Sequence, residues 1–239
     1  MAPNAEPLHF PLATADETAV LVRMHATLEP ELAGLACAAW PDVTGPIRLL
    51  RFLHGFDHDE EKALAAVRSM LELRRSYGFD RVHDQWCSMP CTHTSGFPHQ
   101  AIVSKHMPSI TTLALSVDGH PIVYSAIGKQ DNRACLAELG EEGYLEFYIA
   151  QCESRMAQLH ALSMVQRAMT KLVMVLDLKS VSFWSLAGSS KKTWREISKK
   201  HLDAINSSMA ESLARMYVIN AAGWVVSFYN GIKGLLPAK

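Results

Sequence analysis

The chain has 239 residues, which is enough for one α/β domain with a helical preface or for two small domains. Its 23 Lys and Arg residues nearly balance its 24 Asp and Glu residues, so no net basic field exists to attract nucleic acid. Apolar residues make up 49% of the chain, yet no window approaches the ~18 uncharged apolar residues of a membrane span. The first residues lack a signal-peptide pattern and the five cysteines form no compact framework, so we expect reduced thiols and a cytoplasmic protein.

The chain divides into four predicted regions. Residues 1–14 are rich in proline and are expected to be flexible. Residues 15–79 are predicted to form a helical lobe, and residues 80–107, with many His, Cys and Pro residues, an irregular connector. Residues 108–239 alternate between strand and helix patterns, which predicts an α/β domain.

The helical lobe is predicted to contain four helices. Two short helices, at 15–27 and 31–39, are expected on either side of Pro30. A third, at 47–53, carries an apolar stripe. Acidic residues at 57–61 favour the start of the fourth, because carboxylates cap a helix and interact favourably with its dipole.

A hairpin and a long helix are predicted next. Strand-like runs at 111–117 and 121–127 flank Asp118-Gly119, which is a strong turn signal. Residues 141–167 form an amphipathic helix. Its predicted buried stripe consists of Leu145, Ile149, Cys152, Met156 and Leu159.

The sheet is predicted to be centred on residues 172–176, which are five consecutive apolar residues. Such a run needs burial on both faces, as in a central strand of a parallel sheet with helices on each side. Asp177 follows at the carboxyl end of the strand, the edge at which open α/β sheets bind ligands. Another strand at 215–220 and an unusually apolar helix at 223–236 follow, so we expect a largely parallel sheet flanked by helices.

Four segments, in this order, resemble the CRAL-TRIO family. They are Leu-Leu-Arg-Phe-Leu at 49–53, Asp-Gly-His-Pro-Ile-Val-Tyr at 118–124, Val-Leu-Asp-Leu-Lys at 175–179 and Arg-Met-Tyr-Val-Ile-Asn-Ala at 215–221. The family includes phosphatidylinositol/phosphatidylcholine transfer proteins and retinaldehyde- and tocopherol-binding proteins. The resemblance implies an apolar lipid pocket above the sheet, covered by a mobile gate helix. The implied gate residues are Trp224, Val225, Phe228, Tyr229, Ile232 and Leu235.

The resemblance also implies lipid-binding residues. Tyr124 matches a tyrosine of the family's choline-headgroup site, and Glu211 matches a glutamate of its inositol-headgroup site. Where choline-binding members have Tyr, Ser and Thr, this chain has Cys152, Leu172 and Met174. These three side chains offer no hydroxyl, so phosphatidylcholine is expected to bind poorly, and a sterol or isoprenoid is an alternative ligand.

Two further departures concern the phosphate group of a lipid. The family often has a basic run after Leu-Arg-Phe-Leu, whereas residues 54–57 here are His-Gly-Phe-Asp. In the family the glutamate pairs with a lysine on a later strand, which is expected beyond Lys239, with Lys233 or Lys239 as substitutes. Weak phosphatidylinositol transfer is therefore expected, and the sheet edge beside 215–220 is predicted to be open to self-association.

No cofactor, metal or catalytic site is predicted. Cys87, Cys91 and His93, with His83 and His99 nearby, are zinc-ligand types, but their spacing matches no common zinc motif, which favours a connector loop. A Gly-Ser-Ser-Lys-Lys-Thr run resembles half of a phosphate loop without its first glycine, and the chain has no Gly-x-Ser-x-Gly motif.

Three functional hypotheses follow. The first is a cytoplasmic protein that binds a phospholipid or another hydrophobic small molecule and exchanges it during transient contact with membranes. The second uses the same fold as a lipid-sensing or scaffold module without net transfer. The third, from another class, is an α/β enzyme whose motif is not apparent in the sequence.

Overall fold

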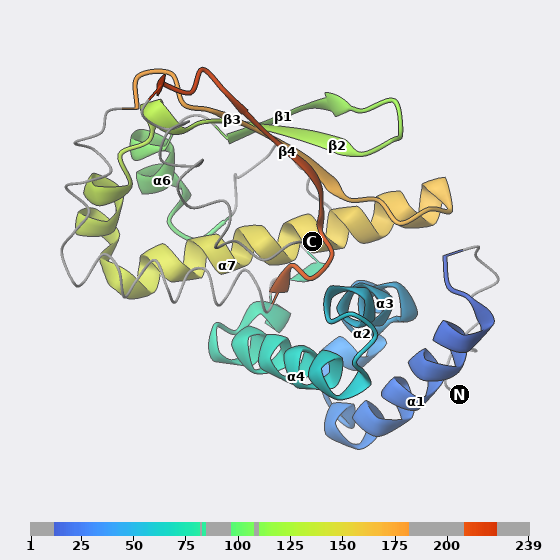
Figure 1. The fold of residues 1–239 in the computed structure, drawn as a ribbon. Helices are drawn as coiled ribbons and strands as arrows, with labels where there is room; N and C mark the ends of the chain where they lie inside the picture. Colours follow the sequence, from blue (N-terminus) through green and yellow to red (C-terminus); the bar gives the residue numbers. More distant parts are fainter. Residues whose placement is uncertain (1–11, 82, 85–96, 108–109, 182–207, 224–239) are drawn as a thin grey trace.

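The computed structural model describes residues 12–81, 83–84, 97–107, 110–181 and 208–223. One long helix, α7, lies between a β-sheet and a lobe of shorter helices (Figure 1). The described elements, in chain order, are α1 (Ala15–Leu32), η1 (Ala36–Ala39), α2 (Pro41–Thr44), α3 (Pro46–Gly55), α4 (Glu60–Ser76), η2 (Phe79–Arg81), α6 (Gln100–His106), β1 (Ile110–Leu115), β2 (Pro121–Ala126), η3 (Ile127–Lys129), α7 (Asn132–Gln166), β3 (Leu172–Asp177) and β4 (Leu213–Ile219). This order confirms the predicted α/β fold with a helical amino-terminal lobe.

The described sheet has the strand order β1-β2-β3-β4. β1 and β2 form an antiparallel hairpin, and Gly119 in its turn has a φ of +78°, which glycine adopts without strain. β2 pairs with β3 and β3 pairs with β4 in parallel, and α7 supplies the crossover that the first parallel pair requires. The predicted largely parallel sheet is confirmed, and β3 lies inside it between two neighbouring strands.

α1 continues through Pro30, where two helices were predicted to be separated, and the end of the second predicted helix forms the 3-10 helix η1. The start of α1 has a capping box, in which Thr14 accepts from the Glu17 N–H at 3.2 Å and Glu17 accepts from the Thr14 N–H at 2.7 Å. Pro30 lies inside the helix instead of ending it. Leu28 and Leu32, on either side of Pro30, are 0% and 4% exposed, so their burial in the lobe offsets the hydrogen bond that proline cannot make.

α3 is the centre of the helical lobe. Residues 47–53 are all at most 2% exposed, so this helix is buried on every side and not along one stripe as predicted. α4 packs beside it in the same core. Asp59 caps α4 by accepting the Lys62 N–H at 3.0 Å, which confirms the predicted acidic start.

α7 begins at Asn132, ahead of the predicted start at residue 141. A non-helical Gly140, at φ 72° and ψ 176°, separates the additional first part from the predicted helix. All five residues of the predicted stripe are buried. Residues 80–107 were interpreted as irregular throughout, but they contain α6, which packs with α7 in a second core.

Candidate functional site

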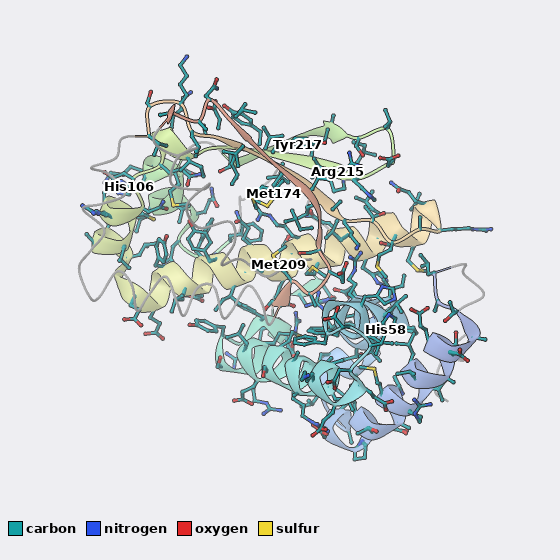
Figure 2. The ribbon with its side chains drawn as sticks, in the orientation of Figure 1. His58, His106, Met174, Met209, Arg215 and Tyr217 are labelled. Atoms are coloured by element: carbon teal, nitrogen blue, oxygen red, sulfur yellow. The ribbon has the colours of Figure 1, made fainter. Side chains whose placement is uncertain are left out.

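An apolar layer separates the sheet from α7. Its buried members are Val123 on β2, Leu172 on β3, and Met156 and Leu159 on α7, with the partly buried Met174 and Met209 packed against them. Figure 2 shows Met174 in this space between the sheet and α7. Side chains alternate between the two faces of a strand, so Leu172 and Met174 share the face toward α7. Half of these six residues are methionines, whose flexible side chains suit apolar surfaces of irregular shape.

The predicted lipid-binding residues do not all belong to this layer. Leu172 and Met174 do, and Cys152 is buried on α7. Tyr124 follows Val123 on β2, so its side chain points to the opposite face of the sheet. The strand register pairs Val123 with Met174, which makes Val123, and not Tyr124, the β2 residue toward α7 at this position. Burial raises the pKa of Cys152 to about 12, which keeps it a neutral thiol and a weak hydrogen-bond donor.

Asp177 joins three strands at the carboxyl edge of the sheet. The Tyr124 hydroxyl donates to its Oδ2 at 2.6 Å. The Asn220 amide, just after β4, and the Lys179 backbone N–H both donate to its Oδ1 at 2.8 Å. Hydrogen bonds from Tyr124, Asn220 and the Lys179 N–H together lower the pKa of Asp177 to about 2. The carboxylate of Asp177, at the predicted ligand-binding edge, therefore already has protein hydrogen-bond donors on both of its oxygens.

Glu211 lies at the other end of the sheet, just before β4. Its side chain forms an ion pair with Lys171, which immediately precedes β3. Its backbone carbonyl accepts from Arg51 of α3 at 3.0 Å. The expected lysine partner on a later strand is therefore not needed to explain this carboxylate, because Lys171 contacts it. Nothing in the spacing of the two residues along the chain indicated this pair.

Buried charges connect the helical lobe to α7. Arg48 of α3 and Arg74 of α4 both bind the carboxylate of Glu153 on α7, and all three side chains are about 3% exposed. Arg51 donates to Ser163 on α7 at 3.1 Å and to the Thr170 carbonyl at 2.6 Å. Such contacts fix the lobe against the helix that carries the apolar layer. The sequence analysis did not predict these buried ion pairs and hydrogen bonds. Two arginines inside the otherwise apolar run 47–53 were the sign of buried charged groups there.

The predicted gate residues 224–235 and the partial phosphate loop lie outside the described residues.

β4 is the last strand of the described sheet, and Met216 and Val218 on it are 49% and 50% exposed. Figure 2 shows Arg215 and Tyr217 on the same strand. Among the described helices, none combines the length and apolarity that crossing a bilayer would require.

The histidines that were considered as zinc ligands have carboxylate neighbours. His83 lies 2.9 Å from Asp42, and its ring stacks on Trp40 at 3.8 Å between ring centroids. His99 lies 2.9 Å from Glu146 on α7. The three remaining residues of that candidate cluster, Cys87, Cys91 and His93, lie outside the described residues.

Comparison with known proteins agrees with the fold. A model of the CRAL/TRIO domain matches residues 115–239, just over half of the chain. Three curated proteins of Arabidopsis thaliana, the phosphatidylinositol/phosphatidylcholine transfer proteins SFH14, SFH11 and SFH7, are 25%, 24% and 22% identical over 175, 203 and 193 residues. These regions cover 72%, 83% and 80% of this chain but 28%, 50% and 33% of the relatives, so the chain spans at most half of their length. The domain match and the mixed sheet behind a helical lobe show that this chain belongs to the CRAL/TRIO domain family.

Proposed function

We propose that this protein binds a hydrophobic lipid, phosphatidylinositol or a related phospholipid, and exchanges it at membranes. The observation that carries the proposal is the CRAL/TRIO match over residues 115–239. It is supported by three relatives that are named as phosphatidylinositol/phosphatidylcholine transfer proteins. In this proposal the protein performs no covalent chemistry, is cytoplasmic and meets membranes only transiently.

The apolar layer is the proposed place for the acyl chains. Each CH₂ group that leaves water contributes about 0.8 kcal/mol, so two acyl chains supply ample affinity. Leu172 and Met174 are the proposed contacts within this layer, and Cys152, which is buried on α7, is the third proposed contact. A lipid must displace packing within this layer, and the methionine side chains can rearrange at a low cost.

Headgroup selection is proposed to rest on two polar positions. Glu211 with Lys171 offers an acceptor and a cation for an inositol phosphate. Tyr124 is the proposed choline contact, but its side chain lies on the face of the sheet opposite the apolar layer, and its hydroxyl is already donated to Asp177 at 2.6 Å. It would have to release that carboxylate to reach a choline headgroup, which supports weak phosphatidylcholine binding.

The apolar segment 224–235 is the proposed gate. Its apolar side chains would cover the lipid in water and contact the bilayer during exchange. A lipid-sensing or scaffold role without net transfer remains the second candidate, because family membership by itself does not distinguish sensing from transfer.

Mass spectrometry of lipid extracted from the purified protein tests the proposal most directly. We expect one phospholipid per protein, and a stoichiometric sterol or isoprenoid would change the ligand class but not the binding role. A vesicle-to-vesicle transfer assay then separates exchange from sensing. Correctly folded protein that yields no stoichiometric lipid and takes up none from vesicles would contradict the proposed function.

A further inference from the structure

Three side chains of the helical lobe converge at a place that the lipid function does not use. The Nε2 atom of His54 lies 2.6 Å from Oε1 of Glu17, and Nδ1 of His58 lies 3.8 Å from the same oxygen. One ligand-type atom from each residue lies within 4.8 Å of the other two. Figure 2 labels His58 in the part of the lobe where α3 and α1 approach each other. Two imidazoles and one carboxylate therefore face a common point.

The end of α3 places the two histidines together. The His58 N–H donates to the Leu53 carbonyl at 2.8 Å and the Asp57 N–H to the His54 carbonyl at 3.2 Å, which is the bond pattern of a Schellman motif. Asp57 and His58 have φ angles of 52° and 64°. Asp and His are among the non-glycine residues that adopt this left-handed conformation most readily. The chain thus turns back after α3, and the His58 ring comes within 5.2 Å of the His54 ring, centroid to centroid.

The carboxylate is oriented by the start of α1. Oε2 of Glu17 accepts the Thr14 N–H at 2.7 Å within the capping box, which leaves Oε1 toward the two histidines. The Glu17 side chain is 14% exposed, and those of His54 and His58 are 29% and 60% exposed. One side of the cluster is therefore supported by the protein and the other is open to water.

We propose that Glu17, His54 and His58 bind a divalent transition-metal ion of the Zn²⁺ class, with water as a further ligand. Two imidazole nitrogens and one carboxylate oxygen suit this class, as does an open fourth position. Zn–N and Zn–O bonds of about 2.0–2.2 Å put tetrahedral ligand atoms about 3.3 Å apart. The observed 2.6 Å and 3.8 Å lie on either side of that value, so small side-chain rotations are enough to admit the ion.

Ion binding at this place would connect α1 to the turn between α3 and α4. Because the ligands come from segments 37 residues apart, the ion would stabilise the folded lobe relative to the unfolded chain. This stabilising role of the ion follows from the structure of the helical lobe alone and does not depend on which lipid is bound.

The experiment measures Zn²⁺ affinity of the full chain by calorimetry and Co²⁺ binding by visible absorption. The variants preserve the local backbone: Asn at position 58 tolerates the left-handed conformation, and Gln at position 17 retains the capping box. We expect His58→Asn, His54→Gln and Glu17→Gln each to weaken Zn²⁺ binding at least about tenfold. His25→Gln, on an exposed position of α1, is the matched control and should leave the affinity unchanged.

Three results would overturn the proposal. The first is equal Zn²⁺ affinity in the wild type and in the His54→Gln/His58→Asn double variant, with both folded by circular dichroism. The second is loss of binding only when Cys87 and Cys91 are replaced, which would assign the ion to those cysteines. The third is a Co²⁺ absorption spectrum that does not change when His58 becomes Asn. If His54→Gln fails to fold, the exposed His58→Asn variant still decides the outcome.

Discussion

The Tyr124 hydroxyl donates a 2.6 Å hydrogen bond to Oδ2 of Asp177, which joins β2 to β3 on the face of the sheet opposite α7. Asn220 and the Lys179 N–H occupy the other oxygen of the carboxylate. At the edge where open α/β sheets usually bind ligands, both oxygens of this carboxylate already accept hydrogen bonds from the protein. A ligand group that binds Asp177 therefore competes with these three donors.

Tyr124→Phe is expected to raise the pKa of Asp177 from about 2 toward its ordinary 3.8, because it removes the largest cause of the shift. A carboxyl whose pKa is lowered by folding stabilises the folded state above its unfolded pKa, and that contribution disappears as the pH falls toward 2. The variant should therefore be less stable than the wild type at neutral pH, with a smaller difference near pH 3. Carboxyl NMR titration and urea unfolding at both pH values measure this.

Tyr217→Phe on the neighbouring strand is the control for that comparison. Its hydroxyl is not one of the donors to Asp177. An unchanged pKa of Asp177 in Tyr124→Phe would show that Asn220 and Lys179 alone hold the carboxylate ionised.

Glu153→Gln is expected to destabilise the protein by about 3–5 kcal/mol, because Arg48 would keep its charge in the interior without a carboxylate and Arg74 would retain only Asp80 as a carboxylate partner. Glu146→Gln is the matched control on the same helix. Glu146 pairs with His99 and is 32% exposed, so its loss should cost less than about 1 kcal/mol. Urea unfolding measures both, and equal effects would show that the buried arginines find other partners.

The strands and the buried stripe of α7 could be predicted because each depends on a pattern of apolar residues within one short segment of the sequence. Five consecutive apolar residues at 172–176 predicted a central strand, and β3 has a strand on each side. Of these five residues, Leu172 and Val173 are buried and the other three are half-buried. Leu145 and Met156 belong to a stripe at helical spacing, and both are buried. The predicted break at Pro30 was wrong because the local preference of proline to end a helix is outweighed by tertiary packing. Leu28 and Leu32, on either side of it, are buried in the lobe.

Side-chain partners that lie far apart in the sequence could not be predicted in this way. Arg48 and Glu153 are separated by 105 residues, and although Arg48 interrupts an apolar run, no pattern in the sequence identifies its partner. The direction of Tyr124 follows from strand alternation, but its contact with Asp177 follows from the register of β2 against β3. His58 meets Glu17 only because the chain takes a left-handed turn after α3, which helical spacing does not describe.

Phe228→Asp or Ile232→Asp is expected to slow lipid exchange more than it lowers the melting temperature. A charge on the proposed gate opposes contact with the hydrocarbon part of a bilayer. Asn230→Asp, in the same segment, adds the same charge at a residue that is already polar and serves as the control. Vesicle transfer rates and thermal unfolding are compared, and unchanged exchange with a large loss of stability would make both residues ordinary core positions.

Met174→Thr is expected to raise phosphatidylcholine affinity by up to roughly tenfold, because it returns a hydroxyl to the face toward α7. Met209→Thr makes the same chemical change elsewhere in the apolar layer and should not raise it. Binding of fluorescent phosphatidylcholine measures the difference. Tight binding by the wild-type protein would instead show that Leu172 and Met174 do not limit headgroup recognition.

Lys171→Met is expected to lower phosphatidylinositol transfer and to leave transfer of uncharged lipids unchanged. In the structure Lys171 pairs with Glu211, and both side chains are less than 30% exposed, so a phosphate placed there would gain a partly desolvated cation. A hydrogen bond to a charged group contributes about 1.5–3 kcal/mol, or roughly 10–100-fold in affinity. Lys129→Met, at an exposed lysine near the opposite edge of the sheet, is the control. Equal transfer by both variants would mean that the Glu211–Lys171 pair only holds β3 and β4 together, and any headgroup site must then use other residues.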